Sequence, residues 1–142
     1  MKSLTHEGPG KTTAADWIGK TDVLAKTAPV KIPIEATVNI KNKAGGYDQI
    51  SYKWSDGTYK YEARWHTPTP NAPAGSKNSW VLERTTPGTP TGQVKVEHMY
   101  TPGVNGDWTP KWQWQNAVDA YNNNCMTELQ AEIMKVGHMP AQ

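Results

Sequence analysis

Hydrophobic and polar positions divide the chain into three parts. Residues 1–29 contain KTTAADWIGKTDVLAKTA, a pattern typical of a short helix for which Thr12 or Thr13 is a suitable N-cap. Residues 30–100 are dominated by the two-residue alternation of half-buried strands, and residues 101–142 return to helical spacing. Gly and Pro separate these parts, so we expect an N-terminal helical element, a sheet and a helical tail.

The middle part predicts an antiparallel meander of roughly four strands. YDQISYKW, TYKYEARWH, SWVLERT and QVKVEHMY each read as a strand, and turn-forming residues separate them. Asp56 and Gly57 indicate a hairpin between the first two, because both residue types accept positive φ. The preceding VKIPIEATVNI also alternates, but Pro33 restricts it to an edge strand or a bent extended segment.

The last part predicts two helices. TPKWQWQNAVDAYN forms the first, with Asp107 just before it as a suitable cap, and MTELQAEIMKVG forms the second, which ends at Gly137. Trp108 and Trp112 are four residues apart and are expected to face the sheet, with Trp114 on another side. The fold class that we expect is α+β, with an N-terminal helix, a four-stranded antiparallel meander and two C-terminal helices in one domain.

The composition fits a small domain with an aromatic core. The chain has 142 residues, 36% of them hydrophobic, with seven Trp, six Tyr and no Phe. No apolar run approaches the ~20 residues that cross a bilayer, and the N-terminal residues lack the apolar centre of a signal peptide. We therefore expect a soluble chain without a targeting signal. A net charge of +2 is compatible with nucleic-acid binding but does not require it. Cys125 is the single cysteine, which excludes an intramolecular disulfide.

The segment TYKYEARWH places three side chains that can take part in acid-base or phosphate chemistry on one face of a strand. Residues two apart share a face, so Glu62, Arg64 and His66 lie together while Ala63 and Trp65 turn the other way. Many strands alternate in this way because one face is solvated. Carboxylate, guanidinium and imidazole are nevertheless groups of acid-base and phosphate chemistry, and the Thr-Pro sequence after His66 ends the strand at an open loop.

Later segments add further candidates for the same chemistry. A neutral imidazole can take the proton of a ribose 2′-hydroxyl, a protonated one can give a proton to the 5′-oxygen, and Arg or Lys can stabilise the phosphorane between them. The third strand supplies Arg84, and the fourth supplies His98 and Lys95. A lone strand histidine is more often packed or hydrogen-bonded, so His98 ranks below His66. Lys77, in the loop APAGSKNS, is a further candidate for substrate binding.

Metal chemistry has little support in the sequence. His6, His66, His98 and His138 are far apart, and no HxxH, HxH or paired Asp/Glu spacing appears. We therefore expect no metal and no cofactor. His138 is interpreted as a C-terminal helix cap.

Several segments together resemble a known family of bacterial toxins. VKIPIEATVNIKNKAGGYDQISYKWSDGTYKYEARWHTPTPNAP, SWVLERTTPG, KWQWQNAVDA and a closing GH are similar to C-terminal toxin domains of contact-dependent growth inhibition and filamentous-haemagglutinin-like proteins, over most of residues 22–138. The resemblance implies a polymorphic toxin released from a secreted or cell-surface parent protein, acting in the cytoplasm of a target bacterium and neutralised by a cognate immunity protein. Many such domains join an N-terminal helix to a four-stranded antiparallel sheet and cut RNA, frequently tRNA, without a metal.

The resemblance also implies roles for individual residues. The segment YEARWHT contributes Arg64, His66 and Thr67, and WVLERTTPG contributes Arg84 and Thr85. It implies that His66 acts as general base or acid and that Arg64 and Arg84 bind the phosphate. The two threonines are expected to contact the substrate.

Two other classes of function stay open. One is a toxin of different chemistry, such as a metal-dependent DNase, which a chelator would inhibit. The other is a non-enzymatic protein-binding module, in which the charged strand face meets solvent or protein. An immunity protein for a nuclease is expected to be acidic, because it covers a basic site, and the need for a host activating factor is left open.

Overall fold

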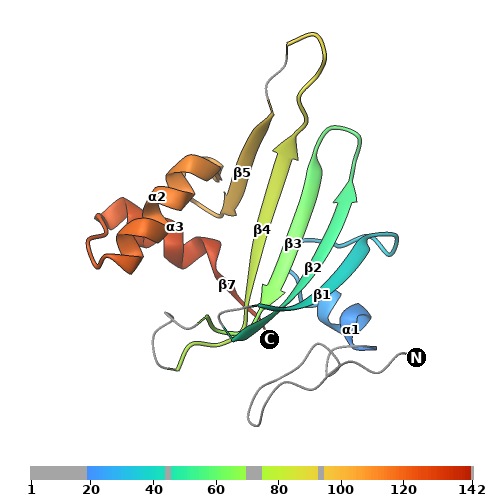
Figure 1. The fold of residues 1–142 in the computed structure, drawn as a ribbon, viewed down its shortest axis with the longest axis horizontal. Coiled ribbons are helices and arrows are strands. Elements are labelled where there is room, and N and C mark those ends of the chain that lie inside the picture. The colour runs from blue at the N-terminus through green and yellow to red at the C-terminus, as the bar shows by residue number, and fades with distance from the viewer. Residues whose placement is uncertain (1–18, 44–45, 70–74, 93–94, 142) are drawn as a thin grey trace.

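The computed structural model describes residues 19–43, 46–69, 75–92 and 95–141. Within these ranges the fold is α+β, with seven strands in one antiparallel sheet and three helices. Strands β1 to β6 lie side by side in chain order, and β7 pairs with β4. Figure 1 shows α2 and α3 beyond the β5 side of the sheet and α1 beside β1 and β2.

The helices and strands of the described ranges have the following bounds. The helices are α1 (Thr21–Ala25), α2 (Lys111–Asn122) and α3 (Glu128–Gly137). The strands are β1 (Thr37–Lys43), β2 (Tyr47–Ser55), β3 (Lys60–His66), β4 (Ser79–Thr86), β5 (Val96–Thr101), β6 (Asp107–Pro110) and β7 (Met139–Pro140).

The four predicted strands are present as β2 to β5, but the sheet is larger than predicted. The segment that contains Pro33 becomes regular after the proline and forms β1, an edge strand paired with β2 along its whole length. The N-terminal helix is confirmed only over Thr21–Ala25, and its predicted caps, Thr12 and Thr13, lie outside the described residues.

Asp107 begins a strand, so its predicted role as a helix cap is wrong. Its φ of 74° is left-handed, and its carboxylate accepts a hydrogen bond from the Gly103 backbone N–H at 2.7 Å. This turn folds the chain back onto β5, with Asp107 opposite Thr101, before α2 begins. The side chain that was expected to cap a helix therefore stabilises the β5–β6 turn.

The β2–β3 hairpin lies at the predicted turn residues, although they act differently. Only Gly57 takes a positive φ, of 93°. The Asp56 carboxylate instead accepts hydrogen bonds from the backbone N–H groups of Thr58 at 2.9 Å and Tyr59 at 2.8 Å. The aspartate side chain therefore closes the loop by satisfying backbone donors.

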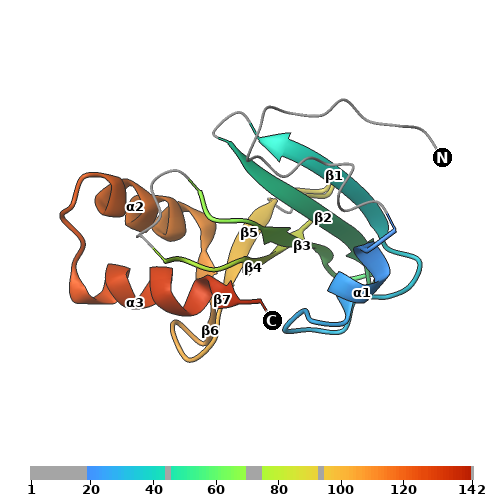
Figure 2. The same cartoon turned by 90° about the horizontal axis from the view of Figure 1, so that it is seen from below.

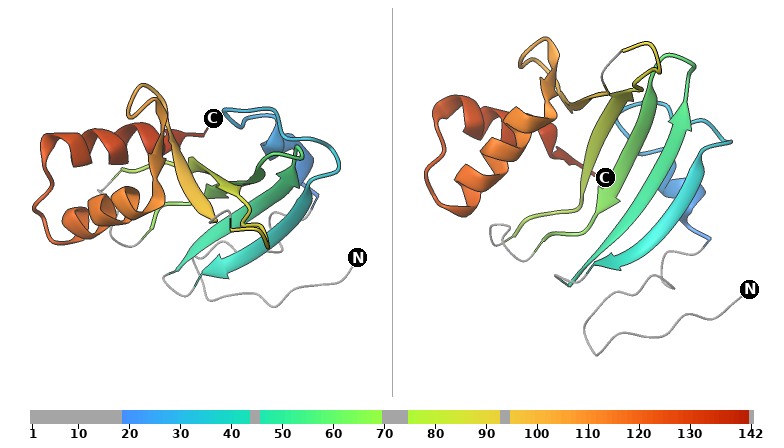
Figure 3. Two further views of the ribbon diagram at one scale, coloured as in Figure 1. Left: turned by 90° about the horizontal axis from the view of Figure 1, so that it is seen from above. Right: turned by 45° about the horizontal axis from the view of Figure 1, so that its top comes forward.

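Each face of the sheet carries a hydrophobic core. The core on the first face, which we call the α1 face, is packed by Leu24 and Ala25 of α1 and consists of Ile50, Tyr52, Ala63, Trp65, Trp80 and Leu82. The core on the second face, the α2/α3 face, joins β4 and β5 to the two C-terminal helices through Val81, Met99, Trp114, Ala117 and Ile133. Figures 2 and 3 show α2 and α3 lying side by side at one end of the sheet. Glu62 and Arg64 of β3 remain partly exposed on this second face.

The predicted orientation of Trp112 and Trp114 is wrong, whereas Trp108 packs against the core on the α1 face. Trp112 is 68% exposed, whereas Trp114 is 7% exposed and belongs to the α2/α3 core. Trp108 lies on β6, before the helix begins, so its four-residue spacing from Trp112 does not define a helical face. The burial of Trp114 becomes important for the site described next.

Candidate active site

Strand pairing brings His66 and His138 together from distant parts of the chain. His66 ends β3 and is paired with Ser79 at the start of β4. The short β7, which follows α3, pairs with the same end of β4, so that Pro140 lies opposite Ser79. The two imidazole rings meet edge to face, with their centroids 6.2 Å apart.

A backbone carbonyl holds each of the two rings. Nδ1 of His66 donates to the carbonyl of Thr67 at 2.9 Å, and Nδ1 of His138 donates to the carbonyl of Met134 at 2.7 Å. Because a carbonyl oxygen only accepts, each neutral ring carries its hydrogen on Nδ1. In the described part of the chain, no residue hydrogen-bonds Nε2 of either ring. Each neutral ring therefore keeps a basic nitrogen available.

Burial lowers the pKa of both His66 and His138. Loss of solvation disfavours the imidazolium and is the largest cause for each ring, although the carbonyl hydrogen bonds oppose it. The nearby positive charge of Arg64 lowers both pKa values further, and the charge of protonated His138 adds to the shift of His66. Since both pKa values lie below the ordinary 6.5, the neutral form of each ring predominates at pH 7.

The two histidines line a cavity of about 500 Å³ between the sheet end and the C-terminal helices. Lys77, from the loop before β4, and Lys135, from the last turn of α3, also line it and supply positive charge. The other polar lining residues are Thr69, Ser76, Ser79, Tyr121 and Asn122. The cavity can therefore receive an anionic group beside two neutral imidazoles.

Arg64 lies between the histidines and a cluster of charged residues on the same face. One terminal guanidinium nitrogen donates to Glu62 at 3.1 Å and to Glu83 at 3.2 Å. Glu83 is 6% exposed and also accepts two hydrogen bonds from the Lys111 ammonium group, at 3.0 and 3.1 Å. The carboxylates hold the guanidinium in place, and its other nitrogens have no hydrogen-bond partner among the residues that the structure describes.

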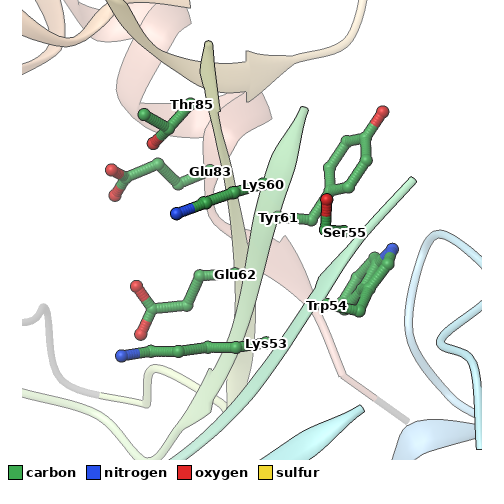
Figure 4. A pocket seen from close by; sticks show the side chains of 8 residues that line it. All are labelled: Lys53, Trp54, Ser55, Lys60, Tyr61, Glu62, Glu83 and Thr85. Atoms are coloured by element: carbon green, nitrogen blue, oxygen red, sulfur yellow. The ribbon is translucent and has the colours of Figure 1, made fainter. Parts of the chain in front are cut away.

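A second hollow on this face, of about 370 Å³, lies toward the β2–β3 hairpin. Figure 4 shows the side chains around it, among which Lys53, Lys60, Glu62 and Glu83 point to one side of the strands. Lys53 is the cross-strand neighbour of Glu62, and Lys60 is the cross-strand neighbour of Thr85. The strand β3 thus carries polar side chains from this hollow to the histidine cavity.

Five of the predicted site residues lie on one face of β3 or beside the histidine cavity. Glu62, Arg64 and His66 share one face of β3, as predicted, and Lys77 lines the cavity with His66. Thr67 also lies there: its carbonyl holds the His66 ring, and its hydroxyl accepts a hydrogen bond from the Asp48 backbone N–H at 2.9 Å. Thr67 therefore positions the imidazole.

Two predicted substrate-binding residues lie away from the histidines. Thr85 pairs with Lys60, which is ~20 Å from His66 along β3. Lys95 directly precedes β5, whose first residue, Val96, pairs at the far end of β4. Neither side chain reaches a phosphate held beside the two rings, although Thr85 lines the second hollow.

Arg84 and His98 lie on the opposite face of the sheet. They are cross-strand neighbours on β4 and β5, on the α1 face. The Arg84 guanidinium is sandwiched between the Tyr59 ring at 4.3 Å and the Trp108 ring at 4.0 Å. Successive strand residues alternate faces, so Arg84 cannot share a phosphate with Arg64, as the resemblance implied. Nε of Arg84 and Nδ1 of His98 are buried, and neither has a hydrogen-bond partner among the described residues.

Sequence reasoning did not include His138 or Lys135 in this site. The more important of the two is His138. It is the C-cap residue of α3, as predicted, and it is also the partner of the His66 ring. The closing GH of the toxin resemblance was the available signal, because helix-cap chemistry alone does not reveal a contact with β3.

Among the described residues, no group of three or more His, Cys, Asp and Glu side chains could hold a metal ion. No helix in those ranges is long and apolar enough to cross a membrane. Comparison of the chain with protein-family profiles, with curated proteins and with solved structures finds no match.

Proposed function

We propose that this protein is a metal-independent endoribonuclease in which His66 and His138 form the acid-base pair. The observation that carries this proposal is the contact of the two rings in one cavity, each with Nδ1 bound to a carbonyl and Nε2 available. Two neighbouring imidazoles, one neutral and one protonated, are the groups needed to take one proton and give another.

The reaction begins at a ribose 2′-hydroxyl beside the scissile phosphate. Neutral His66 removes the hydroxyl proton while the 2′-oxygen bonds to phosphorus, and protonated His138 gives its proton to the departing 5′-oxygen. The products are a 2′,3′-cyclic phosphate and a 5′-hydroxyl. A pair that holds one proton between its two rings supplies both groups, and as part of this proposal the base is assigned to His66 and the acid to His138.

Positive side chains stabilise the charge that develops on the phosphorane. Arg64 is held by two carboxylates, and its other guanidinium nitrogens, which bond no described residue, can bind the phosphate, while Lys77 and Lys135 line the cavity. The 2′-hydroxyl is the nucleophile, so the substrate is RNA rather than DNA.

The toxin resemblance supplies the biological setting of the proposal. The RNase acts in the cytoplasm of a target bacterium, on tRNA as the first candidate, and an acidic immunity protein neutralises it. A tRNA presents single-stranded loops, whose unstacked bases and flexible backbone suit in-line attack.

The test is cleavage of total RNA and of purified tRNA by the purified protein, in EDTA, followed on denaturing gels. Wild type should produce discrete fragments, while His66→Ala and His138→Ala should each lose roughly 10²-fold or more in rate. His98→Ala is the matched control, because it removes the same ring from the other face, and it should cleave normally. Full activity in either His66→Ala or His138→Ala overturns the assignment. Activity that requires a metal, or that degrades only DNA, overturns the proposed reaction, and no activity on either nucleic acid leaves a binding module.

A further inference from the structure

We infer that the second hollow on the α2/α3 face is a subsite for one guanine base of the RNA, recognised by Glu62 and flanked by Lys53 and Lys60. The inference rests on the proposed ribonuclease function and adds a sequence preference to it. The hollow measures about 370 Å³ and opens on the same face of β3 as His66.

Of the two carboxylates that line the hollow, Glu62 is the one that can accept further hydrogen bonds. Its Oε1 accepts from Arg64 at 3.1 Å, and no described residue bonds its Oε2. Glu83 also lines the hollow, but it already accepts one hydrogen bond from Arg64 and two from Lys111. A ligand with N–H donors therefore finds its acceptor in Glu62.

Guanine is the base whose edge matches a carboxylate. Its Watson–Crick edge presents the N1–H and the 2-amino group side by side, so that both can donate to the two oxygens of Glu62. Adenine and cytosine offer an amino group beside an acceptor nitrogen, and uracil offers one N–H between two carbonyls. An acceptor facing a carboxylate is repelled, so these bases bind less well.

Two lysines place positive charge on either side of this acceptor. Lys53 lies directly across from Glu62, and Lys60 precedes it on the same face of β3; neither has a carboxylate within salt-bridge distance in the described ranges. Figure 4 shows both ammonium groups on the side of the strands where the Glu62 carboxylate lies, whereas Trp54 and Tyr61 turn the other way. The subsite therefore reads a base edge and binds phosphates, without an aromatic platform.

The register of β3 links the subsite to the reaction. Glu62 and His66 lie on one face of the strand, ~13 Å apart along it. A single-stranded RNA covers this distance in a few nucleotides. The guanine is thus bound a few positions from the scissile phosphate, with the backbone following the strand past Arg64.

The experiment measures binding in the His66→Ala background, where cleavage does not interfere. Fluorescence anisotropy compares short adenine-rich oligoribonucleotides that carry, at each position in turn, guanine, inosine or adenine. Guanine at one position should tighten binding about tenfold relative to adenine, and inosine, which lacks the 2-amino group, should lose part of that gain. Glu62→Gln should abolish the preference. Glu97→Gln, which replaces a partly exposed acid on the same face, should keep it.

The lysines give an independent measurement. Lys53→Gln and Lys60→Gln should weaken binding equally for all sequences and reduce its salt dependence. Equal affinity for the guanine and adenine oligonucleotides, or a preference that survives Glu62→Gln, overturns the subsite while leaving the nuclease intact. Failure of the wild-type protein to cleave any RNA would instead remove the function on which the subsite depends.

Discussion

Glu62 and Glu83 lie directly opposite each other on β3 and β4, and one guanidinium nitrogen of Arg64 donates to both. Two like charges in cross-strand register repel each other, so the pair requires a cation between them. Arg64 supplies that cation and at the same time lowers the pKa of both histidines. A single side chain therefore couples the carboxylate cluster to the acid-base pair.

Replacing Arg64 by Gln should raise the pKa values of His66 and His138. The positive charge of Arg64 disfavours a second positive charge on either ring, so its removal favours the imidazolium. NMR titration of the imidazole Cε1–H signals measures both values. Lys60→Gln, which removes a positive charge from the hairpin end of the same strand, should leave them in place. Unchanged histidine titration in Arg64→Gln would contradict the coupling.

Acidification should destabilise the fold through the two histidines. Their pKa values are lower in the folded state than the ordinary 6.5, so below that pH the unfolded chain binds more protons than the folded one. The stability of the neutral rings is present above pH 6.5 and is lost as the pH falls through the lowered folded values. Urea unfolding between pH 7.5 and 5 measures it, and the double variant His66→Gln/His138→Gln should show a shallower decline. An equally steep decline in that variant would assign the effect to other groups.

Glu83→Gln should destabilise the protein by about 2 kcal/mol. The buried carboxylate accepts charge-assisted hydrogen bonds from Arg64 and Lys111, and the amide can neither match their charge nor accept all of them. Glu97, with 34% of its side chain exposed and one contact to Lys111, is the matched control. Glu97→Gln should cost less than about 1 kcal/mol. Equal losses in urea denaturation would show that burial of Glu83 adds nothing.

The faces of the central strands could be predicted because the chain alternates strictly there. In β3, buried Ala63 and Trp65 are interleaved with Glu62, Arg64 and His66, and this two-residue period fixes which side chains share a face. The Asp56-Gly57 turn likewise has a local cause. Such features depend only on residues that are close in the sequence, so they can be predicted without knowing the rest of the fold.

The partner of His66 could not be predicted, because it depends on a contact between distant segments. His138 reaches β3 only because β7 pairs with the start of β4, and two residues form that strand. Arg84 was assigned to the phosphate because it belongs to the same resembling segments as Arg64. Its position on β4 places it on the other face, between two aromatic rings.

Arg84→Ala should therefore affect stability and not cleavage. The guanidinium stacks between Tyr59 and Trp108, and losing both cation–π contacts should cost about 1–2 kcal/mol. Well below the melting temperature, the rate of RNA cleavage should stay within about twofold of wild type, whereas Arg64→Ala should lose activity by roughly 10²-fold. A large loss of cleavage in folded Arg84→Ala would return this residue to the reaction.

Gly137→Ala should disturb both the C-terminal core and the site. A Cβ at this position would lie 2.1 and 2.6 Å from ring carbons of Trp114, so the indole must move. The same indole stacks on the His138 ring at 5.1 Å, with 23° between the planes. Overpacking should cost about 1–3 kcal/mol, and displacement of the His138 ring should slow RNA cleavage. Glu132→Ala, on the exposed side of α3, controls for the change in helix propensity.

The double variant Gly137→Ala/Trp114→Leu separates this clash from other effects of the glycine. If the new methyl group clashes with the indole, Gly137→Ala should lower the free energy of unfolding less with Leu at position 114 than with Trp. The loss of stability in the double variant should then be smaller than the sum of the losses in the two single variants. The double variant should still cleave poorly, because it lacks the ring that supports His138. Strict additivity in urea unfolding would mean that the methyl group acts elsewhere. Normal cleavage without the indole would mean that the Met134 carbonyl alone holds the His138 ring.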